Sequence, residues 1–181
     1  RLSLVGSEMC IRDRRYAQLR NIKSPSNPNP IIDLIYLYNK YGIEDEVIKY
    51  SKQIIKNFSD NEIAIYQLAN FAASTGKINI AQFCYELALE KDYVLGNFAL
   101  TLVEAHISTK DYDAAVTFSE ELLLENPKWL QDQWPIFSSL RALASYGLNR
   151  PDLGEIYLEE FLSEPRICLL YTSDAADDEE R

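Results

Sequence analysis

The chain has few of the residues that build disulfide frameworks or metal centres. Its 181 residues include three cysteines and one histidine, and only Cys84 lies away from the two chain ends. No CxxC or Cys/His spacing is present, which excludes a disulfide framework between the ends and a zinc site of the usual spacing. A glycine-rich phosphate loop is also absent from the sequence. We therefore expect no cofactor and no metal site.

Basic residues and long apolar runs are also scarce. Lys and Arg together number 18 against 28 Asp and Glu, which gives a net charge of −10 at pH 7. Binding to nucleic acid needs clustered Lys and Arg, so we expect no nucleic-acid partner. No apolar run approaches the roughly 18 residues that a membrane-spanning helix requires. We expect that the chain has no membrane span and that its partners are proteins or peptides. We also expect a cytoplasmic location.

The two ends of the chain belong to no pattern found between them. Residues 9–13, MCIRD, can be encoded by codons whose reverse complement, read one base out of frame, gives CLLYT, which is residues 168–172. This inverted repeat resembles the two translated arms of a transposase-type sequencing adapter. We expect residues 1–14 and 168–181 to be such adapter sequence, which is to be excluded from fold reasoning. The remaining chain is then expected to be a piece of a longer protein.

Between the ends, residues of the same kind recur 34 positions apart. The positions in predicted turns are Gly42, Gly76 and Lys110. The small or branched residues that open a second amphipathic stretch are Val47, Ala81 and Ala115. A fixed period of this length predicts a repeat architecture, in which each unit buries its apolar face against the next.

A 34-residue unit with two helices resembles the tetratricopeptide repeat family. The closest single match is KDYDAAVTFSEELLLENP, residues 110–127. The resemblance covers residues 28–165 as repeats 28–61, 62–95, 96–129 and 130–165, and Gly154 aligns with Ala115 only after about five inserted residues. The family's Trp at the first inner position is absent throughout. The resemblance implies an all-α fold, a right-handed α-solenoid of about four helix hairpins.

Apolar stripes with helical spacing predict the core. Those of the first helices are Ile31, Leu34, Ile35, Tyr38, Ile65, Leu68, Ala69, Ala72, Ala99, Leu102, Val103 and His106. Those of the second helices include Ala81, Cys84, Tyr85, Ala88, Ala115 and Leu122. Before the array, residues 23–30 contain three prolines and predict a linker, and residues 15–22 are expected to end another helix.

The sequence offers little for catalysis, and we expect no enzyme activity. Cys84 and His106 could form a nucleophilic pair, but both fall in apolar stripes, so we expect them to be core residues. The acidic clusters at residues 43–46 and 158–164 could hold paired carboxylates. Nothing in the sequence places two of them across a cleft, so we expect solvated helix termini and faces instead.

In the tetratricopeptide family, the first helix of each repeat lines a concave groove that binds partners. Carried onto this chain, the implied partner-binding residues are Ile32, Asp33, Tyr36, Lys40, Tyr66, Gln67, Asn70, Ser74, Asn97, Thr101, Glu104 and Ser108. Aromatic and amide groups with little charge suit an extended peptide. Because Lys40 is the only basic residue of this set, we predict that the groove does not bind a C-terminal carboxylate.

Three functions remain open from the sequence. The first is a protein-interaction scaffold that binds a peptide or partner protein through the groove. The second is an accessory or assembly region of a larger enzyme or envelope protein. The third is self-assembly, in which the acidic array stacks on its own copies. For the oligomeric state, we expect a monomer or weak self-association.

Overall fold

The computed structural model describes residues 2–125 and 127–163, and all regular secondary structure in these ranges is helical. This confirms the all-α prediction. The helices are α1 (Leu2–Lys23), α2 (Asn29–Lys40), α3 (Glu44–Phe58), α4 (Glu62–Thr75), α5 (Ile78–Lys91), α6 (Leu95–Ser108), α7 (Tyr112–Glu125), α8 (Trp129–Asp132), α9 (Trp134–Gly147) and α10 (Pro151–Leu162). None of the described helices is both long enough and apolar enough to cross a bilayer.

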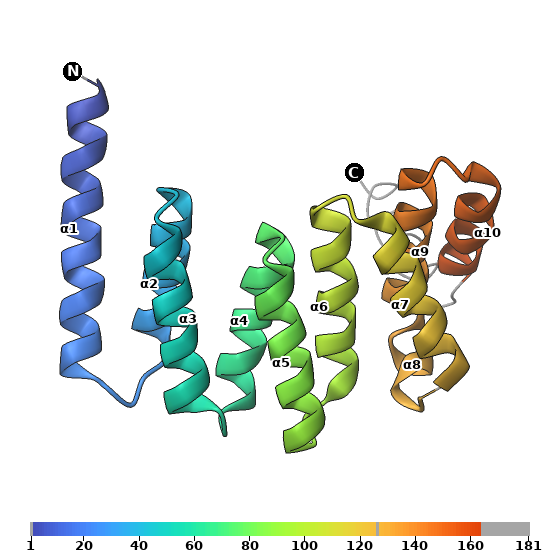
Figure 1. The fold of residues 1–181 in the computed structure, drawn as a ribbon, viewed down its shortest axis with the longest axis horizontal. Helices are drawn as coiled ribbons and strands as arrows, with labels where there is room; N and C mark the ends of the chain where they lie inside the picture. The colour runs from blue at the N-terminus through green and yellow to red at the C-terminus, as the bar shows by residue number, and fades with distance from the viewer. Residues whose placement is uncertain (1, 126, 164–181) are drawn as a thin grey trace, which may run out of the picture.

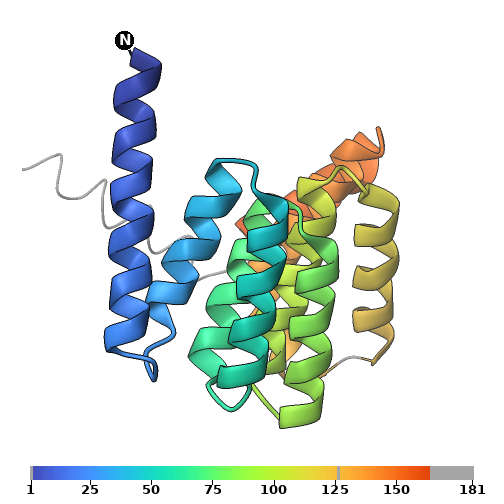
Figure 2. The same ribbon diagram turned by 60° about the vertical axis from the view of Figure 1, so that its left-hand side comes forward.

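The helices stand side by side in chain order, as Figure 1 shows. Helix α1 stands at one end and packs against α2, and its N-terminal part extends past the other helices in both views (Figure 2). The next helices form the pairs α2/α3, α4/α5, α6/α7 and α9/α10. We call α2, α4, α6 and α9 the first helices, and α3, α5, α7 and α10 the second helices. Each first helix contacts the next first helix, and each second helix before the last contacts the next first helix.

The same turn closes the first helix of every pair. In each turn one residue adopts the left-handed conformation, with φ of 66° at Gly42, 65° at Gly76, 63° at Lys110 and 59° at Asn149. The next residue donates its backbone N–H to the carbonyl five positions back, at 2.9 Å in all four turns. These are Schellman-type caps, which satisfy carbonyls left open at a helix end. The recurrence of one turn geometry at the predicted positions confirms the 34-residue period.

The fourth pair is displaced by five residues, as the alignment of Gly154 with Ala115 predicts. The left-handed turn residues lie 34, 34 and 39 positions apart, and the additional residues fall between α7 and α9. They accommodate the short helix α8, whose Trp129 packs against the buried Gly96 at the start of α6. A Cβ on Gly96 would lie 2.8 Å from the Trp129 ring, so the absence of a side chain permits this contact.

The core runs through the stack between first and second helices. The predicted first-helix stripes are buried, from Ile31 and Leu34 in α2 to Leu102 and Val103 in α6, except that His106 is partly exposed. At the start of each second helix, the equivalent positions are all buried: Val47, Ala81, Ala115 and Gly154. Small residues allow close approach of helix axes. A Cβ on Gly154 would lie 2.8 Å from the Tyr146 ring, which shows how closely α9 and α10 pack.

Two segments differ from the sequence expectation or lie outside the described residues. The predicted linker at residues 23–30 is shorter, because α1 extends through Lys23 and α2 begins at Asn29. Pro30 lies in the first turn of α2, where a proline needs no hydrogen-bond donor. Residues 2–14 continue the helix of residues 15–23, and since adapter-encoded residues can also be helical, their predicted origin stays a prediction. Residues 164–181, which include the second predicted adapter segment, are outside the described ranges.

Candidate interaction surface

The first helices leave one side exposed along the stack, and we call it the first-helix face. It comprises the predicted binding residues that are not buried, together with the equivalent positions of α9. One row of this face holds Tyr36, Asn70, Glu104 and Leu143, which are equivalent positions in α2, α4, α6 and α9. Because neighbouring first helices contact one another, these positions lie on one continuous surface.

Ten of the predicted binding residues lie exposed or partly exposed, and two are buried. Ile32 is only 7% exposed because α1 packs on α2 and brings Ala17 into the same apolar cluster. Thr101 is 4% exposed, and its hydroxyl donates to the backbone carbonyl of Phe98 at 2.8 Å, so burial leaves this group satisfied. These two residues are therefore corrected from surface to core positions.

Two tyrosines of the first-helix face are held in place by phenylalanines of the core. Tyr36 meets Phe71 edge to face, with ring centroids 5.0 Å apart and an interplanar angle of 79°. Tyr66 meets Phe98 in the same way at 5.6 Å and 70°. Each ring therefore packs on the neighbouring first helix, an arrangement that adds stabilisation beyond the buried area. Such fixed aromatic rings lose little conformational freedom when a ligand covers them.

The amides of the first-helix face differ in their hydrogen bonding. Asn97 Oδ1 accepts from Gln133 Nε2 at 3.4 Å, a contact that joins α6 to the segment after α8. The Oε1 of Gln67 is buried and has no hydrogen-bond partner among the described residues. An unpaired buried acceptor carries a free-energy cost, so the Gln67 amide is a candidate to reorient when a donor becomes available.

Charge on this face is sparse and partly neutralised. Asp33 accepts from Arg20 Nη1 of α1 at 3.2 Å, an exposed ion pair of the kind that contributes little to stability. Glu104 is exposed on the surface, yet burial of its carboxylate raises its pKa above the ordinary value. A carboxylate that is partly desolvated in this way favours a nearby hydrogen-bond donor or cation. The face can therefore accept a donor at Glu104 and is otherwise close to neutral.

Three exposed apolar residues on this face were missed by sequence reasoning. Ile63 is 71% exposed, Ile136 is 52% exposed and Leu143 is 56% exposed. Ile63 and Ile136 occupy the position of Asn97 in their repeats, and Leu143 occupies the position of Glu104. The 34-residue period alone could have found Ile63, and its extension past the five-residue insertion could have found Ile136 and Leu143. Ile63 adds an apolar side chain on α4, and Ile136 and Leu143 make the α9 end of the surface apolar.

Elsewhere, the residues considered for catalysis lie in structural positions. Cys84 is buried, as predicted, and burial raises the pKa of its thiol to about 12, so the reactive thiolate is not formed near neutral pH. His106 is mostly buried, and its Nδ1 lies 3.4 Å from Asp111 Oδ2. In the acidic cluster at residues 43–46, Glu44 pairs with Lys77 and Glu46 pairs with Lys49.

The described residues also contain no cluster with metal-binding geometry. Over residues 2–125 and 127–163, no three His, Cys, Asp or Glu side chains gather closely enough to hold an ion.

Three comparisons with known proteins complete this description. The chain matches no protein-family model, no curated protein and no solved structure.

Proposed function

We propose that the chain is a right-handed α-solenoid of tetratricopeptide-like hairpins whose first-helix face binds an extended peptide segment of a partner protein. The observation that carries the proposal is the row of Tyr36, Asn70, Glu104 and Leu143 across four neighbouring first helices. The row combines an aromatic ring, an amide, a carboxylate and an aliphatic side chain, which together suit the side chains and backbone of a peptide. The recurrent turn supports the hairpin repeat, because the same cap geometry recurs in each pair.

The dimensions of the stack suit an extended chain that crosses the first helices. Packed helices lie roughly 8–10 Å apart, and an extended chain rises about 3.3 Å per residue. A peptide therefore places about three residues on each helix. Amide side chains such as Asn70 can pair with its backbone N–H and carbonyl groups, and the reoriented Gln67 amide adds a further partner.

The ends of the row select side chains of the peptide. Tyr36, packed on Phe71, offers a fixed ring at one end. Leu143 and Ile136 offer exposed aliphatic side chains at the other end. Glu104, with its pKa raised by burial, favours a donor between them. The preferred ligand is a peptide with an apolar residue over α9 and a hydrogen-bond donor or cationic residue over α6.

The test is selection of random peptides of about nine residues against the full chain, followed by calorimetric measurement of the selected peptides. Asn70→Arg and Leu143→Arg place a long cation on the face and are expected to raise the dissociation constant about tenfold or more, as loss of a central interface contact does. The matched control is Ile156→Arg, an exposed position on α10 outside the first-helix face. The proposal is wrong if no peptide is enriched, or if the selected peptides bind the Asn70→Arg and Ile156→Arg variants equally.

A further inference from the structure

The exposed sides of the second helices carry a charge that reverses along the stack. We call the exposed residues of α3, α5 and α7 the second-helix face. At one set of equivalent positions it holds Lys52, then Glu86, then Glu120. The first of these helices is therefore basic at a position where the next two are acidic. Figure 1 shows α3, α5 and α7 in this order along the molecule.

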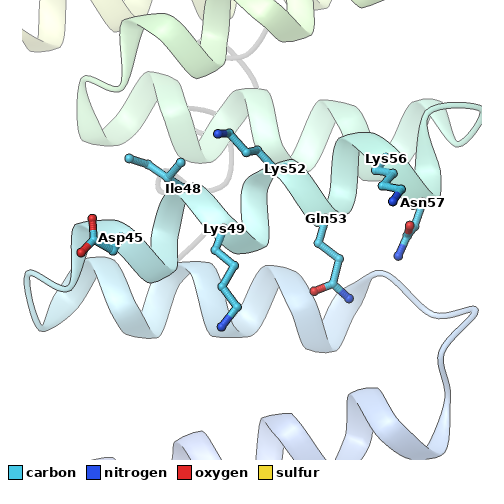
Figure 3. A pocket seen from close by; sticks show the side chains of 7 residues that line it. All are labelled: Asp45, Ile48, Lys49, Lys52, Gln53, Lys56 and Asn57. Atoms are coloured by element: carbon cyan, nitrogen blue, oxygen red, sulfur yellow. The ribbon is translucent and has the colours of Figure 1, made fainter.

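The α3 end of this face is weakly basic, because Lys52 and Lys56 outnumber Asp45 among its exposed charges that form no ion pair with a described residue. A shallow depression follows the outer side of α3 and is lined by Asp45, Ile48, Lys49, Lys52, Gln53, Lys56 and Asn57. Figure 3 shows these side chains arising from one helix, with three lysines among them. Lys49 pairs with Glu46 on the same helix at 2.9 Å. Lys52 and Lys56 form no ion pair with any described residue, so their charge is free for another molecule.

The α7 end of the same face is acidic. Glu120, Glu121 and Glu125 are all exposed there. Glu120 shares a small cavity with Arg141 and Arg150, which offsets part of its charge. Glu121 and Glu125 lie close enough to α5 that, after burial, their carboxylates contribute to raising the pKa of Tyr85. The acidic character of this end therefore comes mainly from Glu121 and Glu125.

The middle of the face carries an exposed aromatic ring. Phe83 of α5 is 45% exposed and occupies the position that Lys49 has in α3 and Thr117 has in α7. An exposed aromatic ring between two ends of opposite charge is a self-complementary arrangement. Two copies can be related by a two-fold axis that lies between them and runs parallel to α5. Each basic end then faces an acidic end, and the two Phe83 rings approach each other.

We propose that two copies of the chain associate through their second-helix faces, with the order of the helices reversed between the copies. The α3 lysines of one copy then lie against the α7 carboxylates of the other. Such an interface is isologous, since the same surface is used by both copies. Opposite charges fix the orientation, because a parallel arrangement would place like charges together. The net charge of −10 on each copy opposes association at long range. At physiological ionic strength this repulsion is screened beyond roughly 8 Å, so the contacts of the face decide.

This interface uses the second helices, and peptide binding is proposed for the first helices. The two proposals can therefore fail independently. A dimer built in this way leaves both first-helix faces open and presents two peptide sites in one assembly.

The test uses reciprocal charge reversal and sedimentation velocity over a wide range of protein concentration. The basic-end variant is Lys52→Glu with Lys56→Glu, and the acidic-end variant is Glu121→Lys with Glu125→Lys. The wild-type chain is expected to dimerise reversibly. Each variant alone is expected to show a dissociation constant about tenfold or more higher, because attractive pairs become repulsive. An equimolar mixture of the two variants is expected to form a heterodimer, since both halves of that interface again join opposite charges.

The matched control is Arg15→Glu with Lys23→Glu, which changes the net charge as much as the basic-end variant does at exposed positions on α1, outside the second-helix face. It is expected to dimerise like wild type, and circular dichroism checks that every variant keeps its helices. A monomeric wild-type chain at all concentrations overturns the proposal. The proposal is also overturned if the control dimerises as weakly as the basic-end variant. A mixture that stays monomeric although both variants are folded has the same consequence.

Discussion

Replacing Gly76 with Ala tests the repeated turn most directly, because Gly42 provides an internal reference. Both glycines adopt the left-handed conformation, with φ of 65° and 66°. A Cβ on Gly42 would meet nothing within 4 Å, whereas a Cβ on Gly76 would lie 2.7 Å from Cγ2 of Thr109. The same substitution therefore imposes backbone strain at one turn, and backbone strain with a clash at the other.

The expected magnitudes follow from these two terms. The left-handed conformation costs a residue with a Cβ about 1–2 kcal/mol, and a more restricted unfolded chain returns about 0.4–1 kcal/mol. Gly42→Ala should therefore lower the free energy of unfolding by roughly 1 kcal/mol or less. Gly76→Ala should cost about 1–3 kcal/mol more, as overpacking does. The Thr109 hydroxyl donates to the carbonyls of Ala105 and His106, and these bonds keep its methyl from turning away.

Urea denaturation followed by circular dichroism measures the difference as a shift in midpoint at constant slope. Thr109→Ser removes the methyl and keeps the hydroxyl, so the double variant Gly76→Ala with Thr109→Ser should return to the cost of Gly42→Ala, after correction for Thr109→Ser alone. Equal costs for Gly42→Ala and Gly76→Ala would refute the clash. A double variant that recovers nothing would show that the added cost does not arise at Thr109.

The remaining predictions concern the other turns and the buried thiol. Lys110→Gly and Asn149→Gly, at φ of 63° and 59°, should each leave stability unchanged or raise it by up to about 1 kcal/mol, because glycine relieves the left-handed strain; a loss of 1 kcal/mol or more in urea denaturation would contradict this. Cys84, whose pKa burial raises from 9.0 to about 12, should react with a thiol reagent only after unfolding at pH 7. The unfolded chain loses the thiol proton near pH 9 while the folded chain keeps it, so stability should fall from about pH 9 to about 12, and Cys84→Ala should reduce that fall in denaturation midpoints.

Much of the fold could be predicted from sequence because the repeat signal is local. Gly42 and Gly76 mark turns where a left-handed residue ends a helix, and the apolar stripes fall on one side of each helix. The other two turns carry Lys110 and Asn149, which adopt the same conformation without being glycine. Asn is itself favoured in this conformation, whereas only the spacing from Gly42 and Gly76 could identify Lys110.

The candidate surfaces were less accessible to sequence reasoning. Ile32 has the spacing of a surface residue, but α1 packs on its side of α2 and buries it. The residues of the first repeat do not indicate this contact. Leu143 was missed because its equivalence with Glu104 depends on where α8 takes up the inserted residues. The first error arises from a contact between elements, which a local pattern does not contain, and the second from the register of the inserted residues.

The amino-acid sequence by itself therefore determined the helices, the period of their turns and the identity of most core positions, since these depend on residues close together in the chain. The tertiary structure decided which exposed residues share a surface. Lys52, Glu86 and Glu120 are 34 residues apart, and they form a row only because the second helices follow one another in order along the stack. Burial and charge at a surface depend on such neighbours from distant parts of the chain, and packing alone brings them together.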